Sequence, residues 1–81
     1  MAHTTAYVLV HAASGSTLAT ARTISQMPGV KVAHAVTGVY DVICQVEADS
    51  LDELATTVVD RIQGVEGVER TETALVVHGG R

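Results

Sequence analysis

The chain has 81 residues, nine of them acidic and five basic, which gives a formal net charge of −4 at pH 7. This sign argues against direct nucleic-acid binding, because phosphate contacts depend on clustered Lys and Arg. No apolar run is long enough to span a membrane, and the first residues lack the charged and apolar regions of a signal peptide. We therefore expect one cytoplasmic domain, residues 1–81, without a DNA-binding domain.

The apolar residues predict a thin core. They make up 47% of the chain, yet Phe and Trp are absent and there are only two Tyr. An 81-residue domain buries only about 60% of the surface of its unfolded chain, so its stability is marginal. We expect contacts between subunits to add to it. The single cysteine, Cys44, lies in an apolar run and is expected to be a buried structural thiol.

The first half of the chain reads as strand, helix, strand. A strand is predicted over Ala6–Ala13 and a helix from Ser14-Gly15-Ser16 to about Met27, where Pro28-Gly29 ends it. Gly29-Val30 then opens a second strand. The residues of the helix expected to face the core are Leu18, Ala21 and Ile24.

The second half repeats this order 38 residues later, as the spacing of Gly29-Val30 and Gly67-Val68 shows. A third strand is predicted over Tyr40–Ala48. A capping box at Ser50 and Glu53 opens a second helix, and a fourth strand covers residues 70–77. The predicted apolar stripe of the second helix is Leu51, Leu54, Ala55, Val58 and Ile62.

Together the two halves predict an α+β fold, a βαββαβ sandwich with a four-stranded antiparallel sheet and two helices on one face. The first and third strands are expected at the centre of the sheet. Its other face is expected to expose alternating Val, Ile, Ala and Thr, an apolar patch that favours dimerisation through the sheet.

The turn between the second and third strands is the most informative stretch. Gly38, Val39, Tyr40 and Asp41 place a glycine, a phenol and a carboxylate at one end of the sheet. Free turn amides can hold a ligand carboxylate, and Asp41 can accept a hydrogen bond from an ammonium group. The residues alone leave a structural role open, in which Asp41 caps the turn and Tyr40 packs against a helix.

Other candidates are weaker. The four histidines, His3, His11, His34 and His78, are not expected to converge, and no metal or cofactor site is predicted. Thr71 and Thr73 carry hydroxyls that can reach a ligand if their face of the sheet meets a partner.

The motifs Pro28-Gly29-Val30, Thr37 to Asp41, the Leu51/Leu54 helix and Gly67 to Thr73, in this order, resemble the effector-binding domain of the Lrp/AsnC transcription regulators. The resemblance covers about residues 6–78. It implies a ferredoxin-like unit that dimerises through its sheet, forms rings of dimers and binds amino acids between subunits. It also implies that Gly38 to Asp41 contact the ligand, with Thr71 and Thr73 as further candidates.

Three hypotheses follow. The leading one is a non-enzymatic, oligomeric regulatory module that binds an amino acid and is able to co-assemble with full-length regulators. The second is a dimeric α+β barrel enzyme, such as a small monooxygenase or isomerase. The third is an assembly adaptor that needs no ligand.

Overall fold

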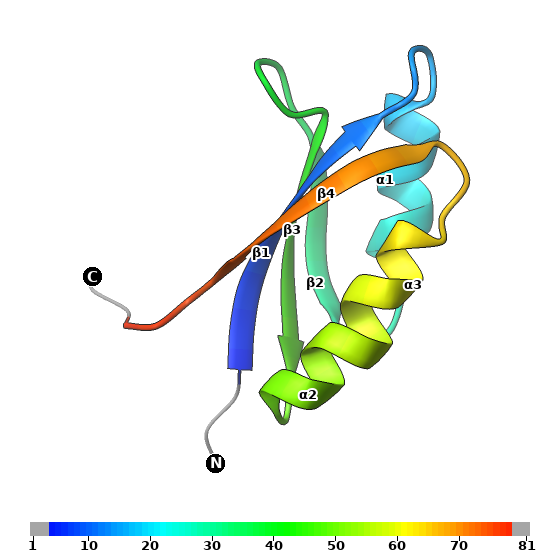
Figure 1. Cartoon of the computed structure of the whole chain (residues 1–81). Coiled ribbons are helices and arrows are strands. Elements are labelled where there is room, and N and C mark those ends of the chain that lie inside the picture. Colours follow the sequence, from blue (N-terminus) through cyan, green and yellow to red (C-terminus); the bar gives the residue numbers. More distant parts are fainter. Residues whose placement is uncertain (1–3, 79–81) are drawn as a thin grey trace.

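The computed structural model describes residues 4–78. They form a four-stranded antiparallel sheet in the order β2-β3-β1-β4, so β1 and β3 lie at the centre as predicted (Figure 1). The strands are β1 (Thr4–Ala12), β2 (Val30–Ala35), β3 (Val42–Ala48) and β4 (Val68–Leu75). The predicted start of the third strand at Tyr40 is wrong, because Tyr40 and Asp41 belong to the preceding loop.

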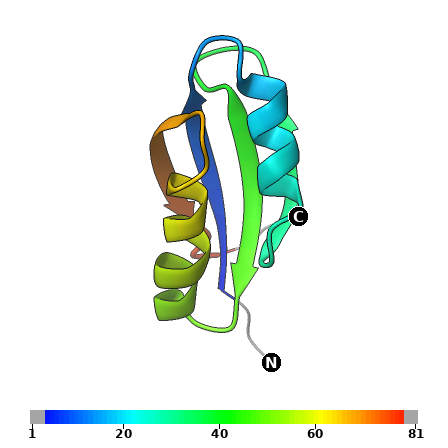
Figure 2. The ribbon, with the colours of Figure 1, turned by 90° about the vertical axis from the view of Figure 1, so that its right-hand side faces the viewer.

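Two helical segments cover one face of this sheet (Figure 2). The first is α1, Thr17–Ser25. The second is continuous but changes its hydrogen bonding along its length: α2, Leu51–Glu53, is followed by a π-helical stretch η1, Leu54–Val59, and by α3, Asp60–Gln63. This arrangement confirms the βαββαβ, ferredoxin-like sandwich.

The predicted capping box is present at the start of the second helical segment. The Ser50 hydroxyl accepts a hydrogen bond from the Glu53 amide at 3.0 Å, and the Glu53 carboxylate accepts one from the Asp49 amide at 3.1 Å. Ser50 thus satisfies an amide that the helix itself cannot pair, while Glu53 pairs with the amide of Asp49, one residue before the N-cap, rather than with that of Ser50. The sequence therefore fixes where this helix begins.

The core lies between the sheet and the helices and is built from small aliphatic side chains. Alternate residues of the two central strands point into it, with Ile24, Leu54 and Ile62 as the largest helical contributors. Cys44 is fully buried among them, and this burial raises the pKa of its thiol to about 11. The strand residues of the core are Ala6, Val8, Val10, Val42, Cys44 and Val46.

Three residues expected in the core lie outside it. Leu18 is 68% exposed and Leu51 56% exposed, and Ala55 is also exposed. Leu18 is six residues from Ile24, which turns it about 120° away around an α-helix, whereas Thr20 is about one turn from Ile24 and is buried. In the second helix, Leu54, Val58 and Ile62 of the predicted stripe are buried, while Leu51 lies in the first turn, before η1 begins.

No helix formed by residues 4–78 covers the other face of the sheet, and we call it the open face. An apolar patch of alternating Val, Ile, Ala and Thr was expected on this face, but charged and polar side chains lie between its apolar ones. Tyr7 is its most exposed large apolar side chain, at 43%. Paired strand positions share a face, so the register assigns to it Thr5, Tyr7, Leu9, His11, Val32, His34, Ile43, Gln45, Glu47, Arg70, Glu72 and Ala74.

Candidate functional site

The loop between β2 and β3, residues 36–41, closes one end of the sheet (Figure 1). The Val36 amide donates to the Asp41 carbonyl at 2.9 Å, which closes the base of the loop. Gly38 has a φ of +115°, a backbone conformation that favours glycine. We refer to Gly38–Asp41 as the tip loop.

Asp41 anchors the tip loop to the central strand β1. Its amide donates to the Val10 carbonyl at 2.9 Å, and its carboxylate accepts a hydrogen bond from the Ala12 amide at 2.8 Å. The carboxylate thus takes the place of the next carbonyl in the β1–β3 ladder, which ends at the Val10–Val42 pair. Asp41 has a structural role, and its remaining lone pairs are available to a ligand.

The amides of the tip loop are the other notable feature. Among residues 4–78, the amides of residues 37–40 have no hydrogen-bond partner in the protein. Val39 is 78% exposed, so the end of the loop projects into solvent. A run of unpaired amides can bind an anion such as a ligand carboxylate by donating hydrogen bonds to it.

Tyr40 lies over the open face and does not pack against a helix. The structural alternative for this turn, in which Tyr40 packs against a helix, is therefore wrong. Its ring lies 4.9 Å from the His11 ring, tilted by 50°. Its hydroxyl donates to the Glu72 carboxylate on β4, and this hydrogen bond is the main cause that raises the pKa of the Tyr40 phenol. The Arg70 guanidinium approaches His11 Nε2 at 3.2 Å.

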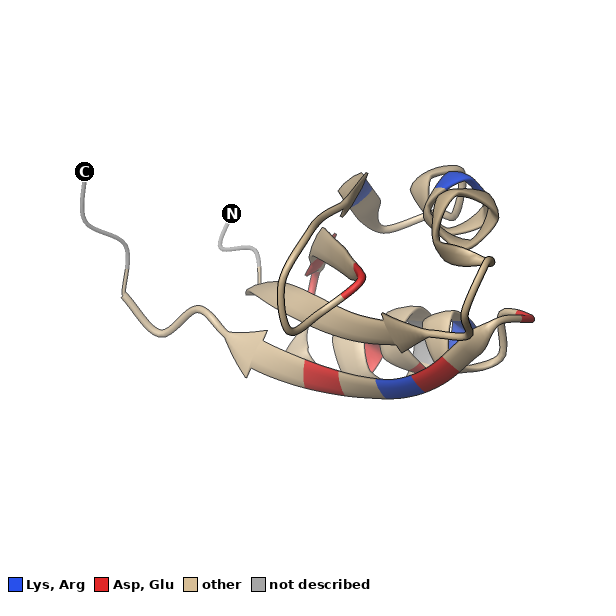
Figure 3. Ribbon diagram, turned by 90° about the horizontal axis from the view of Figure 1, so that it is seen from above, with Lys and Arg blue, Asp and Glu red and all other residues tan. Residues whose placement is uncertain are grey.

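Sequence reasoning did not select His11, Arg70 and Glu72 as site residues. Charge alternates along β4, where Arg70 lies between Glu69 and Glu72 (Figure 3). The register brings Arg70 opposite His11 and Glu72 opposite Leu9 on the open face. The alternation of polar residues in β4 was the available signal, but it identifies partners only once the strand pairing is known.

Thr71 and Thr73 lie on the other face of β4. They pair with Val10 and Val8, whose side chains point into the core, and the Thr71 hydroxyl accepts a hydrogen bond from the Gln63 side chain at 3.0 Å. The structure therefore groups Gly38, Val39, Tyr40 and Asp41 and keeps Thr71 and Thr73 separate from them, on the helix-covered face.

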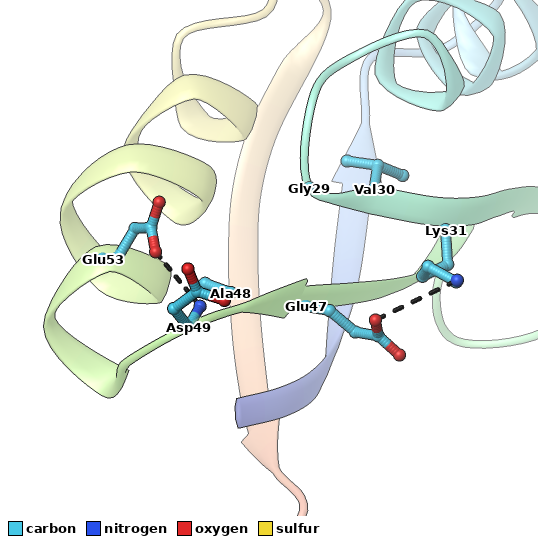
Figure 4. Close-up of a pocket in the computed structure, with 7 residues that line it drawn as sticks. All are labelled: Gly29, Val30, Lys31, Glu47, Ala48, Asp49 and Glu53. Carbon is cyan, nitrogen blue, oxygen red and sulfur yellow. Dashed lines mark hydrogen bonds and ion pairs between the residues drawn. The ribbon is translucent and has the colours of Figure 1, made fainter. Parts of the chain in front are cut away.

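A surface hollow lies at the opposite end of the sheet, where β2 begins and β3 ends (Figure 4). Its lining contains one amine and three carboxylates, with Lys31 and Glu47 4.0 Å apart. Within the described part of the chain, no group of three His, Cys, Asp or Glu side chains is placed to hold a metal ion, and His3 lies outside that part. Residues 4–78 contain no helix that is long and apolar enough to cross a membrane.

The ferredoxin-like fold hosts many functions, so the class of this domain follows from its family. Residues 5–79 match the family model described as the Lrp/AsnC ligand binding domain. The chain belongs to this family, which confirms the resemblance seen in the sequence.

Two similar proteins match most of the chain at more than 30% identity. An uncharacterized HTH-type transcriptional regulator of Pyrococcus horikoshii, PH1916, is 33% identical over 75 residues, which are 89% of this chain and 50% of the regulator. The crystal structure of TTHA0845 from Thermus thermophilus is 35% identical with a TM-score of 0.87, covering 96% of this chain and 98% of that one. The chain thus spans about half the length of the curated regulators that it matches.

Two further matches are more distant or cover less of the matched protein. The regulator NMB0573 of Neisseria meningitidis, solved as an L-Met complex, shares the fold with a TM-score of 0.79 at 19% identity, over 93% of this chain and 50% of that one. A homocitrate synthase of Sulfurisphaera tokodaii is 39% identical over 61 residues, or 75% of this chain but only 13% of the enzyme. So small a share carries no catalytic activity over to this chain.

Proposed function

We propose that this domain binds a free amino acid at the tip loop and works as a regulatory module in an assembly of several copies. The run of unpaired amides beside the Asp41 carboxylate carries this proposal. An amino acid presents a carboxylate and an ammonium group a few ångströms apart, and the tip loop offers donors for the first and an acceptor for the second.

The family and its relatives support the same ligand class. The chain is a ligand-binding domain by family, and NMB0573, which has the same fold, was solved with L-Met. Val39, at the end of the tip loop, is largely exposed. We therefore expect the ligand's side chain to be held by a neighbouring copy of the domain.

Association with other copies also fits the distribution of apolar surface. The core contains no aromatic side chain, while Tyr7 on the open face is 43% exposed and Val77, beyond the end of β4, is 88% exposed. Covering such residues in an assembly stabilises it by roughly 25 cal/mol for each Å² of apolar surface removed from water. The same surfaces can join this domain to regulators that carry a related domain.

Isothermal titration with each common amino acid tests the proposal. Asp41→Asn removes the negative charge but keeps an oxygen that can accept from the Ala12 amide, so we expect a folded protein with at least about tenfold weaker binding. Asp60→Asn, the same change at an exposed position of helix α3, is the matched control and should bind like the parent. No heat with any amino acid, from a folded protein, would contradict the proposal.

A further inference from the structure

Glu72 on the edge strand β4 contacts the tip loop through the side chain of Tyr40. Its carboxylate accepts a hydrogen bond from the Tyr40 hydroxyl, and the two residues are 32 positions apart in the chain. β4 pairs with β1, whereas the loop joins β2 to β3. The hydrogen bond is thus a tertiary contact between the loop that carries the proposed ligand site and a strand that does not pair with that loop.

The Tyr40 side chain is held at two points. Besides the hydrogen bond of its hydroxyl, its ring lies 4.9 Å from the His11 ring, tilted by 50°, a separation at which neighbouring rings attract each other. The Arg70 guanidinium lies 3.2 Å from His11 Nε2 and connects the His11 ring to β4. β1 therefore supplies the contact to the Tyr40 ring and β4 the contact to its hydroxyl, and together they define one position for the phenol.

The backbone of the loop depends on such a contact because, among residues 4–78, its hydrogen bonds lie at its base. The Val36 amide donates to the Asp41 carbonyl, and Asp41 is joined to β1 through its amide and its carboxylate. The amides of residues 37–40, which the proposed function assigns to the ligand, have no such bonds within the described part of the chain. Tyr40 belongs to this stretch, and its hydroxyl bonds it to the sheet.

We propose that Glu72 is a positioning residue for the amino-acid site, which acts through Tyr40 and does not itself touch the ligand. By holding the phenol, the Glu72 carboxylate keeps the unpaired amides of the tip loop in the arrangement that binds the ligand carboxylate. The apparent affinity is reduced by the fraction of molecules in the binding-competent state, so losing one hydrogen bond lowers it about three- to tenfold. This effect on affinity rests on the proposed function, whereas the position of Tyr40 can be measured without a ligand.

The position of Tyr40 has an NMR signature in the free protein. The chain has two tyrosines, so in a Tyr7→Phe background labelled tyrosine reports on Tyr40 alone. At one fixed pH, we expect a nuclear Overhauser effect between the Tyr40 and His11 rings. Glu72→Ala removes the acceptor and should reduce this effect by at least about half, while Glu72→Gln keeps an oxygen acceptor and should retain it. Glu69→Ala, at a second exposed carboxylate of β4, is the matched control and should leave it unchanged.

Isothermal titration of the same variants with each common amino acid measures the consequence for the site. Glu72→Ala should weaken binding about three- to tenfold, and Glu72→Gln and Glu69→Ala should bind within about twofold of the parent. In a Tyr40→Phe background the hydroxyl is absent, so Glu72→Ala should cause no further loss of affinity. This result separates a role through Tyr40 from a direct contact between Glu72 and the ligand.

The proposal would be overturned by a Tyr40–His11 contact or an affinity that Glu72→Ala leaves unchanged, by equal losses in Glu69→Ala, or by a further loss from Glu72→Ala in the Tyr40→Phe background. If Glu72→Ala fails to fold, Tyr40→Phe removes the same hydrogen bond from the loop and should weaken the contact with His11 to the same extent. A weaker ring contact in Glu72→Ala, in a protein that binds no amino acid, would refute the proposed function but support the hold of Glu72 on Tyr40.

Discussion

Asp41 is expected to stabilise the fold as well as to bind ligand, and the two contributions can be separated. Its carboxylate is the hydrogen-bond acceptor for the partly buried Ala12 amide. A hydrogen bond to a charged group contributes about 1.5–3 kcal/mol, and an unpaired buried amide is costly. Asp41→Ala should therefore lower the free energy of unfolding by about 1.5–3 kcal/mol, a large part of the stability of a domain this small.

Asp41→Asn keeps an acceptor and loses only the charge, so its cost should be smaller, about 0.5–1 kcal/mol. Urea unfolding followed by far-ultraviolet circular dichroism, at one fixed protein concentration, measures both variants. Hydrogen exchange gives a local readout, because the Ala12 amide should lose protection in Asp41→Ala. If both variants unfold within 0.5 kcal/mol of the parent, Asp41 does not anchor the tip loop.

Three further predictions concern stability and titration. Gly67→Ala should lower the free energy of unfolding in urea more than Gly15→Ala does, by at least about 1 kcal/mol. Both glycines have positive φ, but of the two only a Cβ at Gly67 would meet other atoms, 2.6 Å from a buried threonine hydroxyl. Equal costs for the two variants would contradict this. Glu72→Gln should lower the pKa of Tyr40 in an ultraviolet titration. Because the folded-state pKa of Tyr40 is raised, its contribution to stability is present below the unfolded-state pKa and is lost as the pH rises through the folded-state value. The Cys44 thiol, with a pKa of about 11, should react with a disulfide reagent at pH 8 only after unfolding, and fast reaction of the native protein would show that it is accessible.

The fold was predictable because its signals are local. The capping box at Ser50 and the glycine of the β2–β3 turn each act over a few residues, and the 38-residue repeat shows that the same β-α-β order occurs twice along the chain. The exposure of Leu18 and the π-helical stretch Leu54–Val59 were not predictable in this way. They depend on how each helix rotates against the sheet, which packing decides rather than local propensity.

The candidate site was predictable only in part, for a related reason. The tip loop is one continuous segment, so its residues could be selected from the sequence. The contacts that hold Tyr40 come from His11 and Glu72, whose proximity depends on the pairing of β1 with β4. A shift of one residue in that register would move Glu72 to the core face and Thr71 to the open face.

Native mass spectrometry of the purified protein, with and without a mixture of amino acids, tests together whether this Lrp/AsnC ligand-binding domain holds an amino acid and whether it assembles in several copies. We expect an even-numbered assembly that retains an amino acid, and loss of that amino acid in Asp41→Asn but not in Asp60→Asn. A folded assembly that retains none would contradict ligand binding and favour an adaptor, and a monomer would contradict the assembly itself.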